Sequence, residues 1–166
     1  MRRIVIVLAL VVLAALFATG CESSGVGSIA PDFKLQSLDG ESVSLSDYSG
    51  TPVLINFWAT WCGYCREEMP YLQQIDEEWP DSELVVLTVD VRESASRVER
   101  FMQTYNLSLT VLLDSDGSVA QEYNLIGYPT TFFIDKDGII REKASGAFRD
   151  KSSIEYYLKE IIPYLE

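Results

Sequence analysis

Two cysteines separated by two residues, in the stretch WCGYC at positions 61–65, are the residues of this chain most suited to chemistry. Cys62 and Cys65 directly follow an apolar run, and the chain contains only one other cysteine, Cys21. Cysteine pairs at this spacing serve in structural disulfides, in metal sites and in redox couples. These uses require different surroundings, so the rest of the sequence decides between them.

A metal site or a structural disulfide is poorly supported by those surroundings. Structural zinc needs four ligands, normally Cys and His, and this chain of 166 residues has three cysteines and no histidine. Covalent haem attachment requires a histidine after the second cysteine, where Arg66 stands. The stabilisation from a structural disulfide grows with the length of the loop that it closes, and this loop is minimal. We therefore expect neither a metal nor an organic cofactor.

A redox couple fits the position of the pair. A helix is expected to begin near Cys62, which places this sulfur at the positive end of the helix dipole, beside unpaired backbone N–H groups. Both effects stabilise a thiolate and lower the pKa of the Cys62 thiol below the free value of about 8.5. Cys65 lies one turn further along, more buried and within reach to close the ring. Trp61 is expected to pack beside the reactive sulfur and shield it.

The segments on either side of the pair define this strand-to-helix junction. The apolar run PVLINFW at 52–58 suits a central strand buried on both faces. The helix after it is predicted to run to about Trp79, with a kink at Pro70. Its apolar stripe consists of Cys65, Met69, Leu72, Ile75 and Trp79.

The remaining segments alternate between strands and helices. Two short strands are predicted over 32–45, and further strands over 83–91, 109–114, 130–135 and 139–145, the last two as a hairpin. Helices are predicted after Ser94, over 116–124 and from about Asp150. The predicted apolar faces of the first and last of these helices are Val98, Phe101, Met102 and Tyr105, and Ile154, Tyr157, Leu158 and Ile161. This order predicts an α/β fold in which a central mixed sheet carries helices on both faces.

The beginning of the chain has the pattern of an export signal. Two arginines precede an apolar centre and small residues, so residues 1–20 are predicted to be a signal peptide. The stretch ATGC ends at Cys21 and resembles the lipobox of bacterial lipoproteins, although Ala18 stands where Leu is usual. We expect lipidation of Cys21, a flexible tether over 21–30 and one domain over 31–166. An ordinary signal peptide or an uncleaved anchor is the alternative, and each of them exports the domain.

The net charge of −12 is spread along the chain without a basic cluster. This distribution argues against nucleic acid, and against an anionic membrane surface, as the main partner.

Taken together, these stretches resemble a known family. The segment VLINFWATWCGYCREEMPYL, followed by GYPTTFFIDKDG, resembles the thioredoxin superfamily, and more closely its TlpA/ResA-like extracytoplasmic thiol–disulfide oxidoreductases. The entry segment APDF, an additional helix-strand unit between Val91 and Leu113 and the order of these features support the resemblance. It implies a thioredoxin-like fold with an N-terminal β extension and a central helix-strand insert.

The resemblance also implies roles for single residues. Cys62 is the expected nucleophile, Cys65 the resolving thiol and Pro129 a cis-proline facing them. The backbone of Tyr128 is then open to pair with an extended client segment, and Trp61 and Tyr64 complete the substrate-binding surface.

The acid–base group is a further expectation. Asn56 stands where cytoplasmic thioredoxins carry a buried Asp, and Glu68 occupies the position of a glutamate found in the extracytoplasmic branch. We hypothesise that Glu68 is partly buried, has a raised pKa and exchanges a proton with Cys65; the alternative is a solvated helix glutamate.

The implied function is disulfide reduction in exported proteins, with apocytochrome c as one client, a membrane thiol carrier for recycling, and a monomer as the working state. Two alternatives stay open at this point. One is a peroxiredoxin-like peroxidase, although WCGYC does not match the Thr-x-x-Cys context of such enzymes. The other is a non-enzymatic thioredoxin-fold module that binds a partner protein or copper(I).

Overall fold

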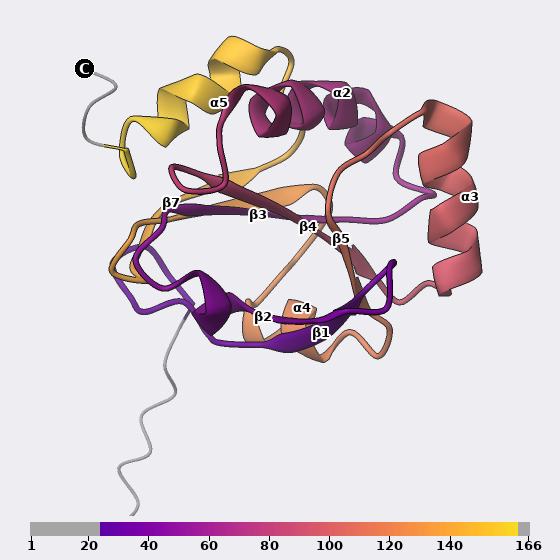
Figure 1. The fold of residues 1–166 in the computed structure, drawn as a ribbon, viewed down its shortest axis with the longest axis horizontal. Coiled ribbons are helices and arrows are strands. Elements are labelled where there is room, and N and C mark those ends of the chain that lie inside the picture. The colour runs from indigo at the N-terminus through magenta and orange to yellow at the C-terminus, as the bar shows by residue number, and fades with distance from the viewer. Residues whose placement is uncertain (1–23, 163–166) are drawn as a thin grey trace, which may run out of the picture.

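The computed structural model describes residues 24–162, which form one mixed β-sheet with helices on both faces (Figure 1). The seven strands lie in the order β2-β1-β5-β4-β3-β6-β7. Strands β3, β4 and β5 are parallel, and all other pairs of neighbours are antiparallel. The strands are β1 Lys34–Ser37, β2 Ser42–Ser44, β3 Val53–Trp58, β4 Val85–Val91, β5 Val111–Asp114, β6 Thr130–Ile134 and β7 Ile140–Ser145. The helices are η1 Leu45–Tyr48, α2 Gly63–Glu78, α3 Ala95–Tyr105, α4 Ser118–Glu122 and α5 Lys151–Leu158.

The two central strands, β3 and β4, are buried along their whole length. Side chains alternate between the faces of a strand, so β3 supplies two separate core clusters. Leu54 and Trp58 pack on the face that carries α2, whereas Ile55 and Phe57 pack on the opposite face. This two-sided burial explains why the run VLINFW is apolar at nearly every position.

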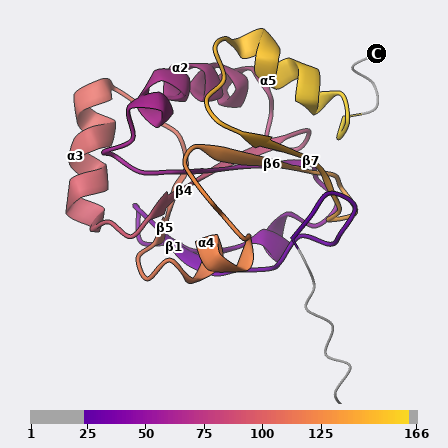
Figure 2. The same ribbon diagram turned by 180° about the vertical axis from the view of Figure 1, so that it is seen from behind.

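Helices cover the two faces unequally (Figures 1 and 2). The layer of α2, α3 and α5 lies over one face, where Met69, Phe101 and Leu158 contribute to the core. The short helix α4 and the helical turn η1 cover the other face through Tyr123 and Leu45. The sheet with helices on both faces is therefore the predicted fold class.

The helix after the cysteine pair covers nearly the predicted range, and Trp79, predicted at the end of its apolar stripe, is only half-buried. Helix α2 includes Pro70 and buries Cys65, Met69, Leu72 and Ile75. Tyr105, which the sequence places on the apolar face of α3, is 44% exposed, so this detail of the prediction is wrong. Tyr105 is the last residue of α3, where its ring packs on Phe101 at 4.6 Å between centroids and its hydroxyl reaches Arg66.

The described part of the predicted tether is folded rather than flexible. Ala30 N–H donates to the Gly138 carbonyl at 2.9 Å, and Gly27 N–H donates to the Ile140 carbonyl at 2.8 Å. Ala30 and Ser24 are both buried. The prediction of a tether over 21–30 is thus wrong for residues 24–30, because their backbone pairs with β7 and the turn before it.

The predicted signal peptide and Cys21 lie outside the described residues. Between residues 24 and 162, no helix combines the length and the apolar character needed to cross a membrane.

Candidate active site

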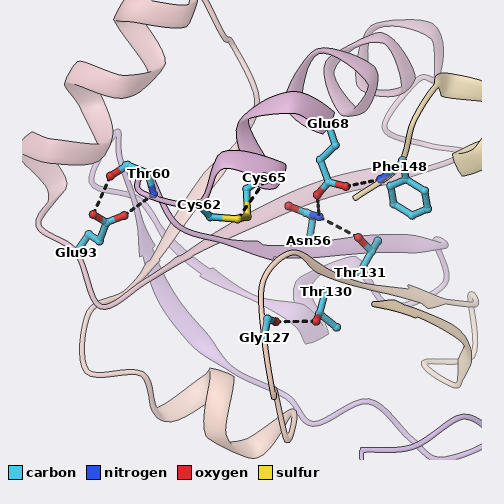
Figure 3. Close-up of a disulfide and its surroundings, with 10 residues drawn as sticks. All are labelled: Asn56, Thr60, Cys62, Cys65, Glu68, Glu93, Gly127, Thr130, Thr131 and Phe148. Carbon is cyan, nitrogen blue, oxygen red and sulfur yellow. Dashed lines mark hydrogen bonds between the residues drawn. A yellow bond between two sulfur atoms is a disulfide. The ribbon is translucent and has the colours of Figure 1, made fainter. Parts of the chain in front are cut away.

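Cys62 and Cys65 form a disulfide where β3 passes into α2, with their Cα atoms 5.3 Å apart (Figure 3). Cys62 is the N-cap residue of α2, and the backbone N–H of Cys65 donates to Cys62 Sγ at 3.1 Å. Cys65 is completely buried, while Cys62 keeps 6% of its surface exposed. The positions expected from the sequence, an outer first sulfur and an inner second sulfur, are therefore confirmed.

The electrostatic surroundings of Cys62 favour a thiolate in the reduced protein. The first turn of a helix has backbone N–H groups without intrahelical partners, and its dipole is positive at this end. The hydrogen bond from Cys65 N–H shows that one of these groups points at Cys62 Sγ. An anionic sulfur accepts such a bond more strongly than a neutral one, so the same contact strengthens when Cys62 ionises.

Glu68 lies on the buried face of α2, one turn after Cys65. Its carboxylate accepts a hydrogen bond from the Asn56 side-chain amide at 2.8 Å and another from the Phe148 backbone N–H at 2.9 Å (Figure 3). Burial raises the pKa of Glu68 from its usual 4.5 to about 7, and the two hydrogen bonds only partly oppose this shift. The predicted burial and raised pKa are confirmed, and the burial is complete rather than partial.

The loop before β6 brings Tyr128 and Pro129 to the segment that carries the cysteine pair. The Tyr128–Pro129 peptide bond is cis, as predicted. The ring of Tyr128 meets Trp61 edge-on, with centroids 5.9 Å apart. Thr130 pairs with Phe57 near the carboxyl end of β3. This pairing places the loop at the end of the central strands where the cysteine segment begins.

A groove runs beside this loop. Tyr64, Tyr128, Pro129 and the segment 146–149 line it. Within the described chain, no hydrogen bond engages the backbone N–H or C=O of Tyr128. Trp61 and Tyr64 are 64% and 69% exposed, so the residues expected to form the binding surface do lie on the surface.

Sequence reasoning missed a second polar cluster at the same end of the sheet. Asp90 is 1% exposed at the end of β4, and Glu93 accepts hydrogen bonds from both the backbone and the hydroxyl of Thr60. The signal available in the sequence was an aspartate inside the buried run ELVVLTVDV, where charged residues are rare. Within residues 24–162, no group of three or more Cys, Asp or Glu side chains is arranged to hold a metal ion.

The strand-to-helix disulfide, the cis-proline loop and the mixed sheet define a thioredoxin-fold thiol–disulfide site. A family model described as AhpC/TSA matches residues 26–143, so the chain belongs to the AhpC/TSA family.

Relatives place the chain more closely within this family. It is 35% identical over 167 residues to a protein of Geobacillus thermodenitrificans named thiol-disulfide oxidoreductase ResA, covering 98% of this chain and 95% of the relative. A crystal structure from Chlorobium tepidum, described as a thiol:disulfide interchange protein DsbE, is 30% identical with a TM-score of 0.75, covering 86% of this chain and 99% of that one. A pneumococcal exposed lipoprotein thioredoxin, Etrx1, is 35% identical with a TM-score of 0.69, covering 78% and 99%. These findings confirm the predicted class, a thiol–disulfide oxidoreductase of the ResA/DsbE type.

Proposed function

We propose that this chain is a membrane-tethered, extracytoplasmic protein-disulfide reductase that works by dithiol exchange at Cys62 and Cys65. The observation that carries the proposal is the placement of an almost buried disulfide between a helix N-terminus, a buried Glu68 and an open groove. The helix N-terminus serves the attack, Glu68 serves the resolution, and the groove serves the binding of the client.

The first step is nucleophilic attack by Cys62. In the reduced protein the Cys62 thiolate attacks one sulfur of a client disulfide, and the second client sulfur leaves as a thiolate. The product is a mixed disulfide between Cys62 and the client. Cys62 takes this role because it is the more exposed sulfur and because Cys65 N–H already points at it.

The second step is resolution by Cys65. Its thiolate attacks Cys62 Sγ, releases the client as a dithiol and restores the disulfide seen in the structure. Cys65 is fully buried and has to lose its proton first. Glu68, on the same helical face and with a pKa of about 7, is poised to accept that proton at neutral pH.

The groove provides the client site. The backbone groups of Tyr128, which form no hydrogen bond among the described residues, can pair with an extended client segment as an added strand, which would place the client disulfide at Cys62. Trp61 and Tyr64 offer exposed aromatic surface on either side of the approach.

The cellular setting rests on the first residues of the chain. The export signal over 1–20 and Cys21 support attachment through a lipid, and the similar Etrx1 structure is described as an exposed lipoprotein. Ser24 is already buried in the domain and stands three residues after Cys21, so a lipid on Cys21 would hold the domain close to the membrane. A membrane thiol carrier would recycle the disulfide, and apocytochrome c is the client that we propose to test.

The deciding measurement is the reduction potential of the Cys62–Cys65 couple, obtained by equilibration with glutathione buffers. A value below about −250 mV supports a reductase that needs an electron supply. A value near −120 mV is that of a strong oxidant and would reverse the proposed direction.

An activity comparison separates the proposal from its rivals. The reduced protein should reduce insulin disulfides and, with a thiol supply, turn over, whereas a Cys62→Ser variant should not. Consumption of peroxide in place of insulin would favour a peroxidase. A flat insulin assay with stoichiometric copper(I) binding would favour a binding module.

A further inference from the structure

A pair of buried carboxyl groups, those of Asp90 and Glu93, lies on the opposite side of the cysteine segment from Glu68. Asp90 stands in register with Trp58 on the neighbouring strand β3, and two residues after Trp58 the chain reaches Thr60. Residues in register on parallel strands project to the same face. Asp90 therefore lies beside Trp58, next to the start of the segment that leads to Cys62.

The carboxylate of Asp90 lacks the partners that a buried charge requires. Its side chain is 1% exposed, and neither oxygen has a hydrogen-bond partner among the described residues. The indole Nε1 of Trp58 is also buried without a partner. An isolated buried carboxylate is strongly unfavourable, and a protein normally avoids it by keeping the group protonated.

Glu93 is the neighbour that can accept a hydrogen bond from the protonated Asp90 carboxyl. The Asp90 carboxyl lies against that of Glu93, three residues further along the chain. Glu93 itself accepts from Thr60 N–H at 2.5 Å and from Thr60 Oγ1 at 2.8 Å (Figure 3). Arg97 Nε lies 2.9 Å from Glu93 Oε1 and donates to Thr60 Oγ1 at 3.1 Å.

We propose that Asp90 and Glu93 share one proton and together act as positioning residues for the segment 59–62 that carries Cys62. In this arrangement Asp90 is neutral and donates to Glu93, while Glu93 is ionised and holds Thr60. The backbone bond from Cys62 N–H to the Ala59 carbonyl, at 3.1 Å, continues this support to the nucleophile.

The charges around Asp90 agree with this assignment. Burial is the main cause that raises the pKa of Asp90, to about 8, and Glu93, in the loop after β4, raises it further. Arg97 from α3 opposes the shift, and Asp114 from β5 adds a small increase. The phenol of Tyr128, in the loop before β6, also faces this cluster, and burial raises its pKa.

The consequence is a pH limit on the geometry at Cys62. When Asp90 loses its proton to solvent, two buried carboxylates face each other and the hold on Thr60 weakens. The effect on client reduction rests on the proposed function, but the coupling between Asp90 and Thr60 does not.

The test uses the oxidised protein, in which the cysteines do not titrate. The 13C methyl signal of Thr60, assigned by its loss in a Thr60→Ser variant, is followed from about pH 6 to about pH 10. We expect one transition with its midpoint near pH 8. An Asp90→Asn variant keeps a donor toward Glu93 but cannot ionise, so its Thr60 signal should stay constant over this range.

Two further variants make the result specific. Glu93→Gln removes the facing charge, so the midpoint at Thr60 should move to lower pH. Glu68→Gln is the matched control, because it removes a buried carboxyl that lies outside the Asp90–Glu93 pair and should leave the Thr60 transition in place. A Thr60 signal that does not titrate, or that titrates equally in Asp90→Asn, would overturn the proposal. Neither result depends on whether the protein reduces disulfides.

Discussion

The side-chain amide of Asn56 donates a hydrogen bond of 2.8 Å to Glu68 Oε1. The same amide nitrogen donates to Thr131 Oγ1 at 2.9 Å. One residue of β3 therefore connects helix α2 with strand β6 behind the disulfide. Because Asn56 cannot ionise, the proton-accepting capacity of this region belongs to Glu68.

The first prediction concerns stability and follows from the raised pKa of Glu68. Its pKa is higher in the folded than in the unfolded protein, so the folded state binds the proton more tightly. The corresponding stability is fully present below about pH 4.5 and is lost as the pH rises through about 7. The loss amounts to about 3 kcal/mol, at about 1.4 kcal/mol per pH unit.

Urea unfolding of the oxidised protein at about pH 4 and about pH 8 measures this loss. A Glu68→Gln variant is destabilised at both pH values. Asn56 and Phe148 both donate hydrogen bonds to the carboxylate, and in the variant one of these donors faces the N–H2 group of the new glutamine. The variant should nevertheless lose about 3 kcal/mol less than the wild type between the two pH values. An identical pH dependence in both proteins would show that Glu68 is not shifted.

The second prediction concerns the resolution step. If Glu68 accepts the proton of Cys65, Glu68→Gln should slow the decay of the mixed disulfide by on the order of 100-fold at neutral pH. Attack by Cys62 should change little, since its sulfur is stabilised by the helix terminus instead. Quenched-flow trapping followed by mass spectrometry resolves the two steps. Equal slowing of both would indicate a general loss of structure, and unchanged resolution would remove Glu68 from the mechanism.

The third prediction concerns the aromatic surface. Trp61 is 64% exposed and touches Tyr128 only edge-on, so Trp61→Ala should cost little stability, about 1 kcal/mol. The same change should raise the KM for a peptide disulfide several-fold and leave kcat nearly unchanged, because it removes client contact and not chemistry. Tyr156→Ala is the matched control, since Tyr156 is 70% exposed on α5 and its ring contacts Tyr157 rather than Tyr128. A lower kcat with an unchanged KM would place Trp61 in the chemistry.

The residue pattern alone predicts those parts of the site that are formed by residues close together in the sequence. The apolar run before Cys62 and the stripe through Cys65 and Met69 predict a strand that passes into a helix, and this junction is what the structure shows. Glu68 could be placed on the buried face because it follows Cys65 by one helical turn.

Contacts between distant segments could not be predicted in this way. The bond from Phe148 N–H to Glu68 joins residues 80 positions apart, and the contact of Glu93 with Thr60 depends on how α3 docks beside β3. Asp90 stands in a run that the sequence already marks as a strand, but packing determines that its carboxyl has no hydrogen-bond partner among the described residues, and this could not be predicted. Composition also misjudged residues 24–30, since small polar residues are common in linkers but equally fit the edge of a sheet.

The last prediction tests that corrected boundary. Residues 24–30 donate and accept backbone hydrogen bonds with β7 and its turn, including Ile140 N–H to the Ser28 carbonyl at 2.9 Å. Asn124 Nδ2 also donates to Ser24 Oγ at 3.0 Å. A chain that begins at residue 31 loses these bonds, and at about 1 kcal/mol for each it should be destabilised by roughly 3 to 4 kcal/mol.

The matched control is a chain that begins at residue 24, which keeps every one of these contacts. Both truncated chains are compared in the oxidised form, so that the disulfide contributes equally. Equal stability of the chains that begin at 24 and at 31 would mean that the segment is a tether after all. A destabilised chain beginning at 31 that retains insulin reduction would instead show that residues 24–30 support the fold while the site stands on β3 and α2.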